Sequence, residues 1–201
     1  LCADELTKKR SVVAETMSRE ITDRIRELGI VGAIFDVSTL SSAKDEPRSF
    51  GRDRIEFVVT TNPGQDFGPL NKVASGGELS RIGLAIQAAT AEQAGVPVVV
   101  YDEIDTGIGG TTANIVGQRL RDVARHCQVI CITHSPQVAS AGDNHLVVSK
   151  SLAEGHMETV IRYVEKFDRE TEISRMLGAE NATESSVAHA RDLIATANQG
   201  N

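Results

Sequence analysis

The sequence predicts an α/β fold with a mainly parallel central sheet and flanking helices. Two apolar, β-branched runs, residues 98–101 and 129–133, have the composition of strands covered on both faces. A segment with helical spacing of its apolar residues separates them, and the loops on either side are short. Strand, helix and strand in this order form the βαβ unit of a parallel sheet. Polar side chains at the carboxyl ends of these strands are therefore the first candidates for a functional site.

The composition is typical of a globular domain with one core. Of the 201 residues, 40% are hydrophobic and 24% are charged. Only 3% are aromatic and the net charge is −7, which argues against a base-stacking surface and a broadly basic nucleic-acid face. The sequence contains neither an apolar run long enough to span a membrane nor a signal peptide, so we expect a cytoplasmic protein with no membrane partner.

The cysteines are interpreted as core thiols. The three are Cys2, Cys127 and Cys131, and the last two lie in an apolar setting. Their odd number and this setting predict buried thiols in a reducing compartment. His126 and His134 lie beside them without a spacing typical of a metal site, so we favour core packing over a metal centre.

The N-terminal part is predicted to be one long helix followed by a β-hairpin. Apolar residues recur over residues 1–28 at nearly heptad spacing, and Gly29 ends the pattern. This amphipathic helix is either the end of a coiled coil or a helix that lies on the domain. The segments expected next are strands at 31–40 and 54–61, a polar connection at 41–53 and a loop at 65–72.

The remaining elements follow from the same patterns. A helix is expected over residues 78–93, and Thr111 or Thr112 should cap the helix between the two apolar strands. Segments 146–149 and 159–164 are predicted to form a short edge hairpin. Two closing helices should follow, capped by Asp168 and Thr183.

Ser75-Gly76-Gly77-Glu78 forms a glycine-paired turn that leads into the 78–93 helix. Adjacent glycines allow the phosphates of a ligand to approach the backbone, and Ser75 adds a hydroxyl donor. The unpaired N–H groups of the first helical turn point the same way. Considered alone, however, such a turn is more often an ordinary helix entrance.

Asp102 and Glu103 follow the first apolar strand directly. Two adjacent carboxylates at such a position are costly unless a cation or a proton neutralises one of them. One could hold Mg²⁺ that carries nucleotide phosphates, and the other could deprotonate an attacking water. The alternative is a solvated strand end. His134, after the neighbouring strand, could contact a terminal phosphate near Glu103 or be structural, and Asp105 is either a turn-forming residue or an interface contact.

Taken together, these motifs resemble those of the ATP-binding-cassette (ABC) ATPases in order and spacing. The matching segments are Ser75-Gly76-Gly77-Glu78 for the signature motif, residues 98–103 for the Walker B strand, residues 104–107 for the D-loop and His134 for the switch histidine. Glu78, where transporters usually carry Gln, moves the match toward the SMC-like chromosome and repair ATPases. Residues 62–139 are similar to bacterial DNA repair members of that class; Ala74 and Ser135 replace a commoner Leu without removing a chemical group.

A phosphate-cradling G-x-x-x-x-G-K-[ST] loop does not occur in the sequence. In the resembled family that loop lies in an N-terminal lobe, which a long coiled coil separates from the C-terminal lobe. The resemblance therefore implies that residues 29–201 are the C-terminal lobe of an ABC/SMC-type P-loop ATPase head and that residues 1–28 are the end of the coiled coil. The start at Leu1 rather than Met leads us to expect a fragment. Because the phosphate-cradling loop is absent from the sequence, we expect the chain by itself to be inactive as an ATPase.

The resemblance also implies roles for the residues, with ATP and Mg²⁺ as cofactors. Asp102 would hold Mg²⁺, Glu103 would activate water, and His134 would sense the γ-phosphate of ATP bound by the Walker A lobe of the same head. The residues expected to face ATP on a second head, or to lie at that interface, are Ser75, Gly76, Gly77, Glu78 and Asp105. The implied partners are that N-terminal lobe, a second head in a homodimer, DNA and a recombinase, at double-strand breaks in the nucleoid.

Two other functions remain open at this point. A nucleotide-binding subunit of an ABC transporter fits poorly, because of Glu78 and the N-terminal helix. A non-hydrolytic interaction module would leave Asp102 and Glu103 as solvated acids. The position of a DNA site is also open, and Arg48, Arg52 and Arg54 are candidates to line a groove for it.

Overall fold

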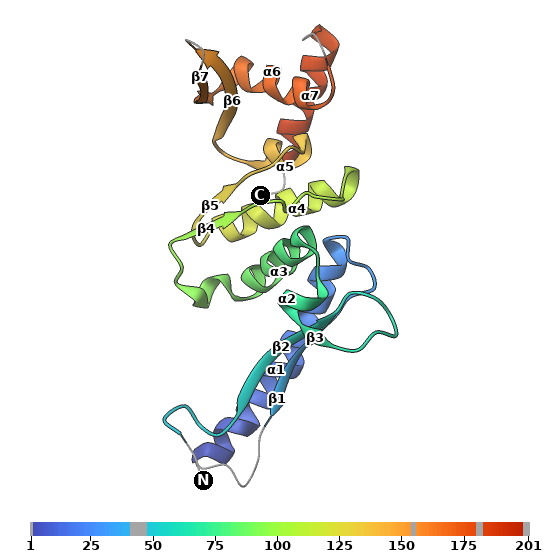
Figure 1. Ribbon diagram of the computed structural model, residues 1–201, viewed down its shortest axis with the longest axis vertical. Coiled ribbons are helices and arrows are strands. Elements are labelled where there is room, and N and C mark those ends of the chain that lie inside the picture. The colour runs from blue at the N-terminus through green and yellow to red at the C-terminus, as the bar shows by residue number, and fades with distance from the viewer. Residues whose placement is uncertain (1, 41–47, 154–155, 180–182, 199–201) are drawn as a thin grey trace.

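The computed structural model describes residues 2–40, 48–153, 156–179 and 183–198. The helices are α1 (Cys2–Glu27), α2 (Leu70–Val73), α3 (Gly76–Ala94), α4 (Gly110–Ala124), α5 (Pro136–Ala141), α6 (Lys166–Met176) and α7 (Glu184–Asn198). The strands are β1 (Ile34–Leu40), β2 (Arg54–Thr60), β3 (Gly68–Pro69), β4 (Val98–Tyr101), β5 (Gln128–Cys131), β6 (His145–Ala153) and β7 (His156–Val164). Figure 1 shows an elongated chain, with α1 and the β1–β2 hairpin at one end and α6, α7 and the β6–β7 hairpin at the other.

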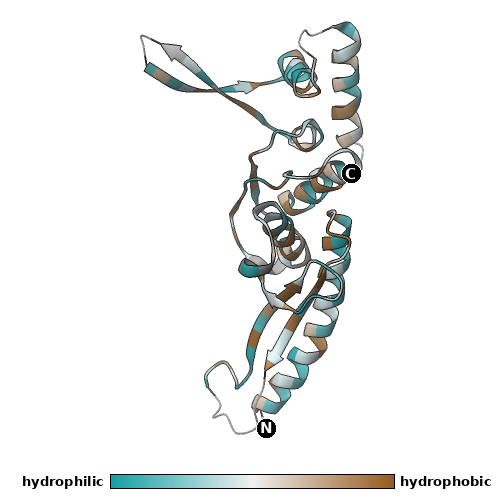
Figure 2. Ribbon diagram, turned by 45° about the vertical axis from the view of Figure 1, so that its right-hand side comes forward, coloured by the Kyte–Doolittle hydropathy of each residue, from teal (hydrophilic) through white to brown (hydrophobic). Residues whose placement is uncertain are grey.

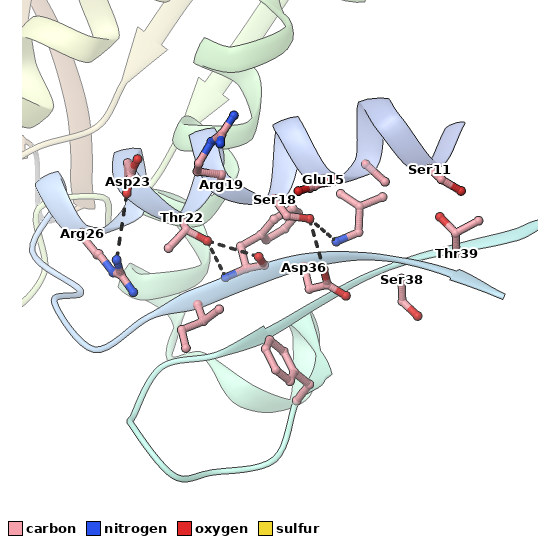
Figure 3. Close-up of a pocket in the computed structure, with 15 residues that line it drawn as sticks. Ser11, Glu15, Ser18, Arg19, Thr22, Asp23, Arg26, Asp36, Ser38 and Thr39 are labelled. Carbon is pink, nitrogen blue, oxygen red and sulfur yellow. Dashed lines mark hydrogen bonds and ion pairs between the residues drawn. The ribbon is translucent and has the colours of Figure 1, made fainter. Parts of the chain in front are cut away.

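Helix α1 lies along β1 and closes the edge of that strand. The apolar stripe is buried in the C-terminal half of the helix, where Ile21 and Ile25 are fully enclosed, whereas Val13 in the N-terminal half is 54% exposed. Two hydroxyl side chains of α1 accept hydrogen bonds from the edge backbone of β1, Ser18 from Val37 N at 2.9 Å and Thr22 from Phe35 N at 2.9 Å (Figure 3). These bonds satisfy edge groups that would otherwise be available for pairing with another strand.

The strands form three small sheets. Strands β1, β2 and β3 pair in that order as an antiparallel sheet, β4 pairs with β5 in parallel, and β6 pairs with β7 antiparallel. Within the described strands, therefore, the parallel part of the predicted sheet is a single pair. The β6–β7 hairpin projects away from the rest of the chain (Figure 2), and it is longer than the short edge hairpin predicted from the sequence.

The β4–β5 pair is covered on one face only. Val99, Val129 and Cys131 pack against the hydrophobic core. The alternating positions Val98, Val100, Ile130 and Ile132 are between 43% and 59% exposed. The prediction of strands covered on both faces is therefore wrong for this chain, because among the described elements no layer lies over the outer face. The total accessible surface of 12551 Å² is also large, since a compact monomer of this mass has roughly 9,200 Å².

Two predicted helix caps are wrong and one is supported. Gly109, not Thr111 or Thr112, is the N-cap of α4. Glu165, not Asp168, is the N-cap of α6, and Asp168 lies in its first turn. Thr183, in contrast, accepts a hydrogen bond from Ser186 N at 3.2 Å at the start of α7. Residue type alone predicts an N-cap at any Thr or Asp near the start of a helix. The conformation of the preceding loop determines which residue becomes the N-cap.

Short elements were not visible in the sequence pattern. The predicted loop at 65–72 contains β3 and most of α2, and α5 follows His134 without having been predicted. Ser135 caps α5 and Pro136 occupies its first turn, but a helix of six residues is too short for a periodic signal. Residues 41–47 of the predicted polar connection lie outside the described residues.

Candidate functional site

The residues singled out in the sequence meet where β4 and β5 end and α3 begins. Residues 102–106, here called the acidic turn, follow β4 and pack against the first turns of α3. Ser80 Oγ donates to the carbonyl oxygen of Asp102 at 2.9 Å. Arg81 Nη1 donates to the carbonyl oxygens of Ile104 at 3.2 Å and Thr106 at 3.0 Å. The glycine-paired turn and the two acids therefore belong to one site within this chain.

The two glycines at the start of α3 have different surroundings. Gly77 is buried, and a Cβ added to it would lie 3.2 Å from the carbonyl oxygen of Glu103 and 3.1 Å from Thr106 Cβ. Its lack of a side chain thus allows α3 to contact the acidic turn. Gly76 is exposed, and a Cβ there would lie 3.0 Å from Glu103 Oε2. Of the pair, Gly76 is the glycine whose surface remains open to a ligand.

Ser75 and Glu78 form a capping box at the N-terminus of α3. Glu78 Oε2 accepts from Ser75 N at 2.9 Å and from Ser75 Oγ at 3.0 Å, while Ser75 Oγ accepts from Glu78 N at 3.4 Å. This reciprocal arrangement satisfies two helix-terminal N–H groups. Glu78 therefore has a local structural role, and Ser75 has to exchange its bond to Glu78 before its hydroxyl can contact a ligand.

Asp102 and Glu103 are both exposed at the end of β4. Glu103 has a φ of 58°, in the left-handed region that non-glycine residues seldom adopt. Such a conformation costs about 1–3 kcal/mol and is concentrated at functional sites. The hydrogen bond from Thr106 N to the Glu103 carbonyl oxygen at 3.1 Å closes the turn around it.

The described ranges contain no group of three or more His, Cys, Asp or Glu side chains that could hold a metal ion. Asp102 is a single exposed carboxylate, which fits Mg²⁺ only when other ligands complete the coordination. Mg²⁺ is commonly held by one or two carboxylates together with substrate phosphates and water. The donor set is thus compatible with Mg²⁺ that arrives with a nucleotide.

Asp105 is buried and serves as an internal acceptor. Its side chain is 1% exposed, and Oδ2 accepts from Thr133 Oγ1 at 2.5 Å, His134 N at 3.0 Å and Ser135 N at 2.9 Å. Burial raises its pKa, but the hydrogen bonds from Thr133 and from the His134 backbone lower it, and the pKa lies below the ordinary value. This position favours the turn-forming interpretation over a contact with a second head, because the carboxylate has almost no accessible surface.

His134 is exposed beside Asp105. Its side chain is 80% exposed, and Nδ1 lies 3.2 Å from Asp105 Oδ2. The sequence placed this histidine near Glu103, whereas the contact that the structure gives it is with Asp105. A bond to Nδ1 leaves the Nε2 edge of the ring for a ligand.

The sequence assigned no role to Arg81 or Thr133. Arg81 is 5% exposed, and burial lowers its pKa, although the charge of Glu78 raises it. The sequence did carry a signal that Arg81 is buried. It lies four residues before Ala85, and this spacing places both residues on the buried face of α3. Thr133 gave no comparable signal, because its bond to Asp105 joins residues 28 apart in sequence.

Two of the three arginines considered for DNA binding are paired with acids. Arg52 Nη1 lies 3.5 Å from Asp4, and Arg54 Nη2 lies 2.8 Å from Glu56. Their charge is therefore partly compensated within the chain, and the structure provides no support for a basic groove at these residues.

A groove lies elsewhere, between α1 and β1 (Figure 3). It has a volume of about 750 Å³, and none of the predicted site residues lines it. Ser18 and Thr22, two of its polar residues, already bond to β1. The acidic turn therefore remains the candidate functional site, because the predicted site residues lie around it and not in this groove.

Two of the three cysteines pack against the core, while Cys2 is exposed. Cys127 and Cys131 are partly buried and free, and both pack against the core. Burial, with smaller contributions from Asp105 and Asp102, raises the pKa of Cys131 to about 12, so this thiol is unreactive at neutral pH.

No helix in the described part of the chain has the length and apolar character needed to cross a membrane.

The sequence is similar to curated DNA repair proteins. No family model matches it. The protein named DNA repair protein RecN from Vibrio cholerae is 41% identical over 196 residues, which cover 97% of this chain and 35% of the relative. RecN from Xylella fastidiosa is 42% identical over 96% of this chain and 34% of the relative, and RecN from Bacillus subtilis is 34% identical over 93% and 34%. The chain thus spans about a third of these relatives, in their C-terminal part.

Solved structures with a similar fold are SMC head domains. The Smc head domain with an extended coiled coil from Pyrococcus furiosus, bound to the C-terminal domain of ScpA, has a TM-score of 0.50 and 20% identity over 77% of this chain and 36% of that chain. The Smc head domain with a coiled coil and joint from Pyrococcus yayanosii has a TM-score of 0.50 and 20% identity over 76% and 27%. The predicted fold class, a C-terminal lobe of an SMC-type head, is confirmed.

Proposed function

The chain corresponds in sequence to the C-terminal part of DNA repair protein RecN, and from this premise we propose how it works as part of an ATPase head. Residues 29–201 are the C-terminal lobe of that head, and residues 1–28 are the end of its coiled coil. An N-terminal lobe with a phosphate-binding loop completes the head. The proposal is supported by the greater length of the relatives, because the chain matches only 35% of the Vibrio cholerae RecN.

The observation that carries this proposal is the exposed apolar face of β4 and β5 beside the two acids. Val98, Val100, Ile130 and Ile132 are each about half exposed. Covering them with a second lobe would contribute roughly 3–6 kcal/mol. A lobe seated on this face would also bring its phosphate-binding loop toward the carboxyl ends of the strands, where Asp102 and Glu103 lie.

The residues of the acidic turn would then act on the terminal phosphate of ATP. Asp102 contributes a carboxylate ligand to Mg²⁺, which neutralises phosphate charge when it is bound. Glu103 orients the attacking water and accepts its proton. His134 contacts the γ-phosphate through Nε2, while Asp105 holds its Nδ1.

Ser75 and Gly76 would contact ATP bound to a second head. Both are exposed at the N-terminus of α3, where helix N–H groups favour an anion. Glu78 supports Ser75 through the capping box, and Gly77 supports the turn by packing on Glu103 and Thr106. ATP binding would close a homodimer of heads and hydrolysis would open it. Because the relatives are named DNA repair proteins, we propose DNA as a partner. The motif resemblance extends this proposal to double-strand breaks, a recombinase and the nucleoid.

The test compares this chain alone with a protein in which a RecN N-terminal lobe and coil precede it. We expect the chain alone to hydrolyse no ATP and the complete protein to dimerise with ATP and hydrolyse it. Glu103→Gln in the complete protein should slow hydrolysis and prolong the ATP-bound dimer. Robust turnover by the chain alone would contradict the proposal that the N-terminal lobe supplies an essential part of the ATP site. Unchanged turnover by Glu103→Gln would remove Glu103 from the role of base.

The same experiment separates the alternatives. Partner binding without ATP-dependent dimerisation or hydrolysis would indicate the non-hydrolytic interaction module. A transporter subunit would instead require membrane-bound partners, a role that neither the relatives nor Glu78 supports.

A further inference from the structure

Helix α3 fixes the backbone on both sides of Glu103. The carbonyl oxygen before this residue, that of Asp102, accepts from Ser80 Oγ at 2.9 Å. Two carbonyl oxygens after it, those of Ile104 and Thr106, accept from Arg81 Nη1 at 3.2 and 3.0 Å. The residue between these bonds has the left-handed φ of 58°.

We propose that Ser80 and Arg81 are positioning residues for Glu103, and that through them α3 links the Ser75-Gly76 turn to the catalytic carboxylate. This inference rests on the proposed function, in which Glu103 acts on one ATP and the start of α3 contacts another. It assigns a purpose to two residues that touch neither nucleotide.

The left-handed conformation of Glu103 needs support from its surroundings. A non-glycine residue leaves this region unless neighbouring contacts hold it there. Ser80 and Arg81 supply those contacts at consecutive positions of one helix. The nearly complete burial of Arg81 keeps water from competing for the two carbonyl oxygens, and an arginine can donate several hydrogen bonds from a rigid plane.

The close packing of Gly77 makes the linkage stiff. Its backbone lies so near Glu103 and Thr106 that a single added methyl group would contact both. Ser75, two residues before Gly77, caps the same helix through the capping box. A ligand that shifts the Ser75-Gly76 turn therefore shifts the contacts around Glu103, since helices move as rigid units.

The linkage predicts that hydrolysis on one head depends on closure of its α3 against ATP on the other. Loss of Ser80 or Arg81 should then impair the chemical step more than ATP binding or dimer formation, because the groups proposed to bind nucleotide are left intact. This pattern differs from that of a variant that simply unfolds, which lowers the amount of active enzyme and the dimer together.

The experiment measures kcat, KM for ATP and ATP-dependent dimerisation in the complete protein carrying Ser80→Ala, Arg81→Lys or Arg81→Met. We expect kcat to fall about 3- to 10-fold in Ser80→Ala and about 10- to 100-fold in Arg81→Met, with KM within about twofold of wild type. Arg81→Lys should recover part of the loss, since one ammonium can still donate to a carbonyl oxygen. Dimerisation with ATP should be retained.

Matched controls remove similar bonds at a distance from the acidic turn. Arg169 Nη2 donates to the carbonyl oxygens of Ser140 at 3.1 Å and Gly142 at 2.5 Å, so Arg169→Met also frees backbone acceptors. Ser11 Oγ donates to Thr7 O at 3.0 Å, so Ser11→Ala matches Ser80→Ala. Both controls should keep kcat at the wild-type value.

The outcomes distinguish this inference from the proposed function. If Glu103→Gln hydrolyses ATP normally, the proposed role of Glu103 fails. If Glu103→Gln is slow while Ser80→Ala and Arg81→Met keep the wild-type kcat, only the positioning role fails. A rise in KM at constant kcat would also overturn the positioning role. If circular dichroism shows that Arg81→Met does not fold, the kcat of Ser80→Ala decides whether the positioning role holds.

Discussion

Asp105 Oδ2 lies 3.2 Å from Nδ1 of His134 and accepts a second bond from the backbone N–H of the same residue at 3.0 Å. One buried carboxylate therefore fixes both the backbone and the ring of an exposed histidine. The acidic turn is joined in this way to the end of β5, as it is joined to α3 by Arg81. The site is consequently a small rigid assembly, even though its outer surface is open.

Replacing Asp105 tests this assembly through its pH dependence. The pKa of Asp105 is lowered in the folded state from its ordinary value of 3.8, so the ionised carboxylate stabilises the fold above that value, and this stabilisation is lost as the pH falls through the folded pKa. We expect Asp105→Asn to lower the free energy of unfolding by about 1.5–3 kcal/mol at pH 7. Urea unfolding at pH 7, 5 and 3 should show the difference from wild type shrinking only in the most acidic sample. A difference that stays constant across the series would contradict the ionised role of Asp105.

Two glycines of α3 form a matched pair for a packing test. An added Cβ at Gly77 would lie 3.1–3.2 Å from atoms of Glu103 and Thr106, whereas at Gly83 it would meet nothing within 4 Å. We expect Gly77→Ala to lower the free energy of unfolding by about 1–3 kcal/mol and Gly83→Ala to raise it by about 0.5–1 kcal/mol, because alanine is the better helix former. Chemical denaturation of both variants measures this. Equal changes in the free energy of unfolding for the two variants would mean that α3 is not closely packed against the acidic turn.

Long elements with a clear period could be predicted from the sequence. The apolar stripes gave α1 and α3 to within two residues at each end, and the β-branched runs gave β4 and β5. The position of Asp102, Glu103 and His134 after the carboxyl ends of two paired parallel strands also followed, although the side chain of His134 contacts Asp105 and not Glu103. These features depend on local pattern and on simple topology.

Contacts between segments distant in sequence could not be predicted. The bonds of Arg81 to the acidic turn and of Asp105 to Thr133 join residues 23–28 positions apart, and residue type alone does not reveal them. The outer face of β4 and β5 was missed for a related reason. A continuous apolar run indicates that both faces of a strand are to be buried, but it does not indicate which segment of which chain covers each face.

Ser75 allows capping and ligand contact to be separated. Its hydroxyl caps α3, so Ser75→Ala should lower the free energy of unfolding by about 1 kcal/mol. In the complete protein, the same change should also weaken ATP-dependent dimerisation, as measured by size-exclusion chromatography. Thr183→Ala is the matched control, because Thr183 Oγ1 accepts from Ser186 N at 3.2 Å at the start of α7. It should lose similar stability and dimerise normally; a parallel loss of dimer in both variants would attribute the Ser75 effect to stability alone.

The exposed apolar face offers the most direct test of the second lobe. Val100 is 59% exposed and Ile132 is 56% exposed, so Val100→Lys and Ile132→Lys should change the free energy of unfolding of this chain by no more than about 0.5 kcal/mol. Binding of the dye ANS, which reports exposed apolar surface, should decrease. With the N-terminal lobe present, the same changes should abolish association between the lobes, because a lysine would be buried there without a partner. Val31→Lys, in the turn after α1 and 78% exposed, should leave association intact. If all three variants associate normally, the face of β4 and β5 is not where the second lobe binds, and the acidic turn would then need another source of phosphate-binding groups.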